Sequence, residues 1–339
     1  MSNTTLKEIA NQLGISITTV SKALKGYSDV SLTTKKAVVD LATKLNYIPN
    51  SFAVNLRTKE SKTIGLIVPT FVHDFFASVI RGILQEAEKR EYLVIILQSD
   101  EKICQEKKQI ELLIQKRVDG ILISLSNETG DFNHLNSIIE QNIPLVLFDK
   151  IAKLVPCSKV TINDQKASYD AVSYLITKGY KKIAHFRGAF LPQNSIDRFL
   201  GYKKALENHN MQYEPNLIFH CENNCDFEDG YNNAKLMMTK NPDVDAIFAV
   251  TDMVAIGAMH YLKEIGVAIP NQIAVLGFSN WFMSEIISPK LSTVDQPGFT
   301  IGEVAAATLF DEIKLKRMNK TVTHKNIEIP TSIIERCST

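Results

Sequence analysis

Residues 5–24 read TLKEIANQLGISITTVSKAL and contain two short amphipathic segments separated by Gly14. Thr5, followed three positions later by Glu8, has the form of a capping box and predicts a helix that begins directly after it. Gly14 predicts the end of that helix, because glycine adopts a left-handed backbone at little cost. Ser16 is placed to cap a second helix. Two short helices joined by a tight glycine turn indicate a helix-turn-helix.

A third helix is expected from its cap, Ser31, to about Leu45. The outward positions of the second helix are short hydroxyls, one apolar residue and two amines, namely Ile17, Thr18, Thr19, Ser21, Lys22 and Lys25. Such a face suits a helix that enters a DNA major groove, where hydroxyls hold phosphates and a few side chains reach the bases. A generic three-helix bundle without a nucleic-acid partner is the alternative.

The charge distribution favours DNA binding by the first part of the chain. The 339 residues carry a formal net charge of +1, but residues 1–60 alone carry +4, and the remainder carries −3. A basic segment on a mildly acidic body indicates that only the segment meets a polyanion. Residues 47–57, YIPNSFAVNLR, follow this segment. Pro49 ends the third helix, and Asn50 or Ser51 could cap one short helix that is too short to be stable alone.

The segments TLKEIANQLGISITTVSKAL, NYIPNSFAVNLRT, TIGLIVPT and IPTSIIERCST resemble the LacI/GalR family of bacterial regulators over essentially the whole chain. The resemblance implies that two hinge helices pair in the minor groove and that Leu56 wedges a base step open. It also implies that Ile17, Thr18 and Lys22 read bases. The family commonly has arginine at the last of these positions, so the operator preference stays open. The full set of expected DNA contacts is Thr5, Ser16, Ile17, Thr18, Thr19, Ser21, Lys22, Lys25, Ser31, Thr34, Tyr47, Asn50, Ala53 and Leu56.

From Ser61 onward, apolar runs alternate with amphipathic segments. The expected strands are Ile64–Val68, Leu93–Leu97, Gly120–Leu125, Leu145–Phe148, Lys182–Phe186, Ala246–Val250 and Ile273–Phe278. Buried strands that alternate with helices predict parallel sheets covered on both faces. These units are too many for one sheet and predict two doubly wound lobes with a ligand cleft between the carboxyl ends of their strands.

The expected fold class is therefore α/β: a small all-α helix-turn-helix head joined to a two-lobed, doubly wound core that resembles periplasmic sugar-binding proteins. The expected divisions are residues 1–46 for the DNA-binding head, 47–60 for the hinge helix and linker, and 61–339 for the effector-binding and dimerisation core. Within the core, the first lobe is expected at about 61–160 and 296–322, and the second at about 161–292 and 325–339.

The candidates for binding a small effector follow the expected strands or crossovers, and they are Phe75, Phe76, Asp149, Asp164, Arg198, Asp252, Ser279, Trp281 and Gln296. By the resemblance, Arg198 matches the effector-binding arginine of the family, and Ser279 stands where relatives usually have aspartate. Arginine suits vicinal hydroxyls or a carboxylate. The expected ligand is a sugar or sugar derivative. An anionic derivative is slightly favoured over a neutral sugar, and a purine stacked on Phe75 or Phe76 is a third alternative.

Other classes of protein fit the sequence less well. No nucleophile elbow, phosphate-binding glycine loop or paired metal-ligand motif is present, so we expect no enzyme, cofactor or metal. Cys221 and Cys225 lack the second ligand pair of a structural zinc site. No secretory signal or apolar span precedes the head, which favours a cytoplasmic regulator over a solute-binding protein. The chain stops at Thr339 without a heptad tail, so we expect a homodimer on a pseudo-palindromic double-stranded operator.

Overall fold

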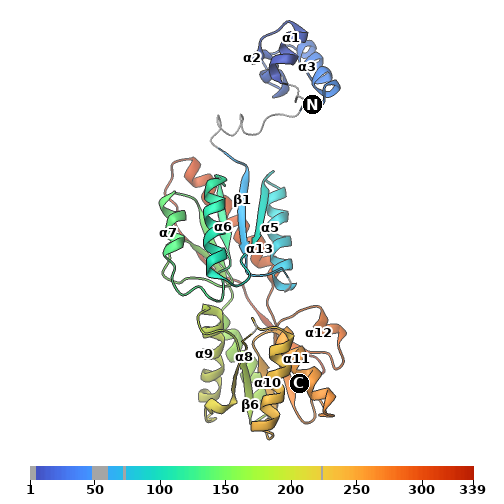
Figure 1. Ribbon diagram of the computed structural model, residues 1–339, viewed down its shortest axis with the longest axis vertical. Coiled ribbons are helices and arrows are strands. Elements are labelled where there is room, and N and C mark those ends of the chain that lie inside the picture. The colour runs from blue at the N-terminus through green and yellow to red at the C-terminus, as the bar shows by residue number, and fades with distance from the viewer. Residues whose placement is uncertain (1–4, 48–59, 72–73, 223) are drawn as a thin grey trace. The chain divides into compact units, whose positions relative to one another are not determined.

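The computed structural model describes residues 5–47, 60–71, 74–222 and 224–339. The chain divides into two compact units, Met1–Ser61 and Lys62–Thr339. In the first unit, called the head below, three helices were predicted and three are described: α1 (Leu6–Leu13), α2 (Ile17–Leu24) and α3 (Leu32–Lys44). The second unit, called the core domain, contains two six-stranded sheets. The predicted fold class is confirmed (Figure 1).

Each helix of the head begins at a side-chain cap. Thr5 and Glu8 form the complete capping box of α1, and Gly14 ends that helix with a left-handed φ of +63°. Ser16 caps α2, and Ser31 caps α3. Because helices this short are unstable alone, the caps act together with a small core. That core is built from Ile9, Ala10, Val20, Ala23, Val30, Val38 and Ala42.

The first lobe of the core domain is a parallel sheet with the strand order β11-β5-β4-β3-β1-β2. Its strands are β1 (Thr63–Val68), β2 (Leu93–Gln98), β3 (Gly120–Ile123), β4 (Leu145–Phe148), β5 (Ser158–Thr161) and β11 (Asn326–Glu328). Its helices are α5 (Asp74–Glu88), α6 (Ile103–Gln115), α7 (Asn133–Glu140) and α13 (Gly298–Arg317). Helices α5 and α13 pack together on one face of the sheet, and α6 and α7 cover the other (Figure 1).

The second lobe is a mixed sheet with the order β12-β10-β9-β8-β6-β7, in which only the pairing of β12 with β10 is antiparallel among the described pairs. Its strands are β6 (Ile183–Arg187), β7 (Ile218–His220), β8 (Ala246–Ala249), β9 (Ala274–Ser279), β10 (Ser292–Asp295) and β12 (Ser332–Ile334). Its helices are α8 (Asp164–Thr177), α9 (Gln193–Asn208), α10 (Phe227–Lys240), α11 (Asp252–Glu264), α12 (Met283–Ile286) and the short helix Pro215–Leu217.

The chain passes between the lobes three times: from β5 to α8, from β10 to α13, and from β11 to β12. The third crossing lies between Glu328 and Ser332, whereas the expected lobe bounds put it between residues 322 and 325. Strand β11 pairs with β5 in the first lobe, so residues 326–328 extend that lobe. A three-residue edge strand is too short for its alternation of polar and apolar residues to predict a strand.

Helices α5 and α13 approach so closely that glycine is required on both. A Cβ atom added to Gly82 would lie 2.2 Å from the carbonyl oxygen of Phe299, and one added to Gly302 would lie 2.0 Å from that of Val79. Both neighbours are backbone atoms, which move only if a helix moves. The close spacing of this helix pair therefore depends on the lack of a side chain at Gly82 and Gly302.

We predict that Gly302→Ala lowers the free energy of unfolding by up to about 2 kcal/mol, because overpacking of about 1–3 kcal/mol outweighs the gain of about 1 kcal/mol in helix propensity. Urea unfolding followed by circular dichroism measures the change. Gly130→Ala is the matched control, since its added Cβ would meet only Leu191 methyl groups at 3.4 and 3.6 Å. Equal stability of the two variants would contradict the prediction.

Candidate functional site

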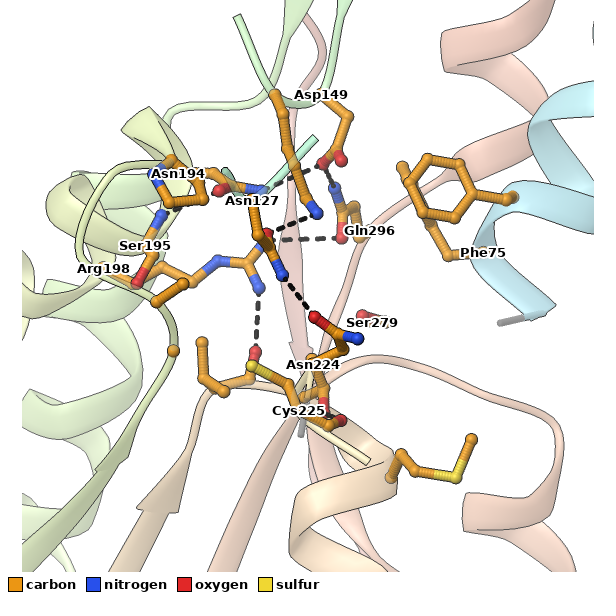
Figure 2. A pocket seen from close by; sticks show the side chains of 18 of the residues that line it. Phe75, Asn127, Asp149, Asn194, Ser195, Arg198, Asn224, Cys225, Ser279 and Gln296 are labelled. Atoms are coloured by element: carbon orange, nitrogen blue, oxygen red, sulfur yellow. Dashed lines mark hydrogen bonds between the residues drawn. The ribbon is translucent and has the colours of Figure 1, made fainter. Parts of the chain in front are cut away.

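A cavity of about 100 Å³ lies between the two lobes of the core domain (Figure 2). Eight of the nine residues proposed from the sequence as effector contacts line it: Phe75, Phe76, Asp149, Arg198, Asp252, Ser279, Trp281 and Gln296. The carboxyl ends of parallel strands point to this edge in both lobes, which is where ligands bind in open α/β folds. The ninth residue, Asp164, lies outside the lining and contacts Arg198.

Arg198, on α9, is buried and uses its guanidinium to connect parts of the chain that are distant in sequence. Its Nε donates to Asp164 Oδ1 at 2.8 Å, and its Nη1 donates to the carbonyl oxygen of Val250 at 2.8 Å. Its Nη2 reaches Gln296 Oε1 at 3.5 Å, and its guanidinium carbon lies 3.7 Å from the centre of the Phe278 ring. These contacts fix the plane of the guanidinium at the cavity wall.

Asp164 is the first residue of α8 and lies at the first crossing between the lobes. Burial raises the pKa of its carboxyl group to about 7, although the positive charge of Arg198 acts in the opposite direction. Asp164 acts on the cavity through Arg198 rather than by lining it.

Asp149 follows β4 and projects its carboxylate into the cavity (Figure 2). Its φ of +55° turns the chain directly after the strand. Gln296 Nε2 donates to Asp149 Oδ1 at 3.1 Å, and Asn194 Nδ2 approaches the same oxygen at 3.4 Å. Ser124 Oγ lies 3.4 Å from the other oxygen. Only the contact from Gln296 is short, so the carboxylate of Asp149 keeps acceptor capacity for a ligand hydroxyl.

The two adjacent phenylalanines at the start of α5 have different positions. Phe75 faces the cavity (Figure 2), while Phe76 is buried in the hydrophobic core of the first lobe. Their rings contact edge to face with centroids 5.1 Å apart. Trp281 also lines the cavity and contacts Phe282 edge to face. Phe75 and Trp281 are therefore the rings that can stack on a flat ligand face.

Asp252 lines the cavity, but its oxygens already accept hydrogen bonds. Trp281 N donates to Oδ2 at 2.6 Å, and Ser284 Oγ donates to the same oxygen at 2.8 Å. Thr293 Oγ1 donates to Oδ1 at 2.5 Å. Burial raises the pKa of Asp252. These contacts support a role in anchoring the start of α11 against neighbouring loops.

Sequence analysis missed several polar residues of the cavity, two of which contact Lys150, the residue that follows Asp149. Lys150 Nζ donates to Glu101 Oε1 at 2.6 Å and to Asn127 Oδ1 at 2.7 Å. Asn127 Nδ2 in turn lies 3.4 Å from Asn224 Oδ1 on the opposite lobe. Asn194 and Ser195 contribute from the start of α9, and the Ser195 hydroxyl has no hydrogen-bond partner among the described residues. The available signal was position, since Asn127 follows the carboxyl end of β3.

In the head, the structure divides the proposed DNA contacts into caps and outward residues. Thr5, Ser16 and Ser31 are helix caps, and Thr19 and Thr34 each bond the cap of their own helix. The outward residues of α2 and its C-cap are Ile17, Thr18, Ser21, Lys22 and Lys25, of which Ser21 and Lys22 are half-buried and the others exposed. The Lys22 ammonium is bonded to Asp29.

The remaining proposed contacts belong to the segment after α3. Tyr47 N donates to the carbonyl oxygen of Ala42 at 2.8 Å, and its ring packs against the core of the head. Asn50, Ala53 and Leu56 lie outside the described residues. Within those residues, no helix is both long and apolar enough to cross a membrane.

Comparison with known proteins identifies both units. Residues 5–50 match the family described as bacterial regulatory proteins, lacI family. Residues 61–337 match the family described as periplasmic binding proteins and sugar binding domain of LacI family. The first match favours a gene regulator over the alternative of a solute-binding protein without a regulatory role.

Individual relatives agree with these matches over the full length. The chain is 31% identical to catabolite control protein A of Priestia megaterium over 99% of both chains. Among solved structures, it matches a LacI-family transcriptional regulator from Enterococcus faecium with bound ribose at 25% identity, with a TM-score of 0.72 over 82% of this chain and 98% of that one.

It also shares the fold of the lac repressor dimer bound to operator and the anti-inducer ONPF, with 22% identity, a TM-score of 0.87 and 99% of both chains covered. The chain therefore belongs to the LacI family of bacterial transcription regulators, with a helix-turn-helix DNA-binding head and a sugar-binding domain of the periplasmic-binding-protein type.

Proposed function

We propose that this regulator represses transcription as a homodimer on a pseudo-palindromic operator, and that a small hydroxyl-rich ligand in the cavity of the core domain controls its DNA affinity. The proposal rests on one observation: the same chain contains a head of capped helices and a core domain with a polar cavity between its two lobes. Because its DNA partner lies in the cytoplasm, we place the protein there. We propose that the ligand is bound and released without chemical change.

The charges at the cavity favour a neutral sugar over an anionic derivative. Lys150 is paired with Glu101, and Arg198 with Asp164, so both lining cations have a carboxylate partner. Asp149 adds a further negative charge to the lining of the cavity. An anion would have to displace one of these carboxylates, whereas sugar hydroxyls can donate to Asp149 and accept from Asn194. The ribose bound in the Enterococcus faecium structure supports the same ligand class.

Ligand control is proposed to act through the distance between the lobes. Three side-chain contacts that join them are long: 3.3 Å between Lys153 and Asp197, 3.4 Å between Asn127 and Asn224, and 3.4 Å between Asn194 and Asp149. Gln296, at the second crossing, bonds Asp149 at 3.1 Å. The three long contacts are weak, so a ligand that bonds both lobes can shift the population of the closed form. A shift of lobe positions would then change the spacing of the two heads in the dimer.

An exposed edge of the first lobe supports the proposed homodimer. Strand β2 is the edge strand of its sheet, and Leu93 at its start is 64% exposed. Leu84 on the neighbouring helix α5 is also exposed. An uncovered apolar edge strand promotes association. A second copy that covers β2 and α5 would bury these side chains.

For DNA, we predict that Leu56→Ala weakens binding to the operator far more than binding to random DNA, because an apolar wedge contributes only where a base step opens. Lys22→Ala should relax the preference at one base pair in each half-site, at a cost of about 1–3 kcal/mol per contact. Fluorescence anisotropy with a selected operator and a random duplex measures both. Equal losses on the two duplexes would remove the wedge from the proposal.

For the effector, we predict that Arg198→Ala weakens sugar binding about 10- to 100-fold, because a hydrogen bond to a charged group contributes about 1.5–3 kcal/mol. A thermal-shift screen of neutral mono- and disaccharides identifies the probe, and calorimetry gives its affinity. Arg317→Ala is the control, since that arginine is paired with Asp119 and lies outside the cavity lining. Asn194→Ala tests the same site without breaking a buried ion pair.

The affinity for the neutral sugar should change little between about 50 and 500 mM salt, because no net charge is brought together. A steep fall in affinity with salt would favour an anionic ligand instead. Wild-type affinity in both the Arg198→Ala and the Asn194→Ala variants would place the ligand elsewhere.

For assembly, we predict that Leu93→Glu converts the dimer to a monomer at micromolar concentration, because a carboxylate would be buried without a partner in the interface. Leu154→Glu is the control, since Leu154 is 95% exposed in a loop away from β2. Light scattering measures the mass. An unchanged dimer in the Leu93→Glu variant, or a stable wild-type tetramer, would contradict the proposed assembly.

A further inference from the structure

Asp29 lies in the turn between α2 and α3 and forms an ion pair with Lys22 on the outward face of the head. The Lys22 side chain is 42% exposed and the Asp29 side chain is 55% exposed, so a partner in solution can reach the pair. Lys22 is also the residue of α2 that the proposed function assigns to base recognition. A proposed DNA-reading cation therefore carries its own carboxylate partner.

The turn holds Asp29 in this position by contacts of its own. Gly26 adopts a left-handed φ of +74°, which closes α2 and reverses the chain. Lys35 Nζ donates to the carbonyl oxygen of Gly26 at 3.1 Å and so ties the turn to α3. Val30, directly after Asp29, is buried in the core of the head. The carboxylate is thus anchored next to Lys22 from both sides.

We propose that Asp29 is a specificity-determining residue, which restrains Lys22 from binding DNA phosphates and lets it bind a matching base pair. This inference rests on the proposed base contact of Lys22. A free lysine ammonium binds any phosphate as a point charge, and such binding carries no sequence information. The paired carboxylate makes this contact less favourable, because a phosphate must approach a like charge.

A guanine edge meets no such repulsion, since its O6 and N7 acceptors are neutral. The ammonium has three donors, so it can keep one bond to Asp29 and direct the other two to guanine. The carboxylate itself can accept from the N4 amine of the cytosine in a neighbouring or the same base pair. The ion pair therefore discriminates between the two kinds of acceptor that DNA offers.

The test compares Asp29→Asn with Asp40→Asn in the full-length protein. Asp40 is an exposed acid on α3, so its removal changes the charge of the head by the same amount. The probes are a duplex of about 30 base pairs, long enough for two half-sites, that the wild-type protein selects from a random pool, and an unselected duplex of equal length. Anisotropy titrations over a range of salt concentrations give both affinities and their salt slopes.

We expect Asp29→Asn to tighten binding to the unselected duplex on the order of fivefold for each bound head, the effect of one nearby unit charge in water. The salt slope on that duplex should steepen by about 0.9 for each head, because each Lys22 then neutralises one more phosphate. Binding to the selected duplex should tighten less, so the ratio of specific to non-specific affinity falls. Asp40→Asn should leave this ratio within about twofold.

Lys22→Met separates this inference from the proposed function. In the Lys22→Met background, Asp29→Asn should have no more effect than Asp40→Asn, because the restrained cation is absent. Two results would overturn the inference while leaving Lys22 as a base contact. In the first, Asp29→Asn still lowers selectivity in the Lys22→Met background. In the second, Asp29→Asn and Asp40→Asn change selectivity equally in the wild-type background. Unchanged selectivity in Lys22→Met alone would overturn the base contact and, with it, the inference.

Discussion

The ion pair between Arg198 and Asp164 is the interaction on which the organisation of the core domain depends. Asp164 begins α8 at the first crossing between the lobes, and Arg198 extends the contact to Val250 at the end of β8 and to Gln296 at the second crossing. Two charges removed from water are stable only when their remaining donors and acceptors are also bonded. Burial of this pair therefore requires that the second lobe and the two crossings next to it are in place. The same requirement fixes the cavity wall to which a ligand would bind.

The head shows a different balance of forces. Its helices have eight, eight and thirteen residues, lengths at which isolated helices are marginal in water. Hydroxyl caps at Thr5, Ser16 and Ser31 satisfy the free amide groups, and a few aliphatic side chains form the core. Residues that could contact phosphates are therefore also residues that hold the helices together. Substitution of a cap would affect folding and DNA binding together.

Local chemistry made much of this structure predictable. The capping box and Gly14 located the helices of the head, and continuous apolar runs located the long buried strands, because both signals act over a few residues. Strands β5, β7, β10, β11 and β12 were missed, since each has only three or four residues and includes polar ones, which leave no clear pattern. In the cavity, residues directly after long strands were found. Glu101, Asn127 and Asn194 were not, because their position depends on how loops fold back over distant parts of the chain. Sequence likewise gave no sign that Lys22 is paired with Asp29.

The three crossings between the lobes also constrain the order in which the protein can be made. The first sheet receives its last strand, β11, from residues 326–328, and one of its covering helices, α13, from residues 298–317. During synthesis, strands β1 to β5 must therefore wait, with one face covered by α5 alone, while the ribosome completes nearly all of the second lobe. Exposed apolar surface of this kind promotes aggregation and recruits chaperones. The hydrophobic core of the head is built from residues within the first 47, so the head can fold long before.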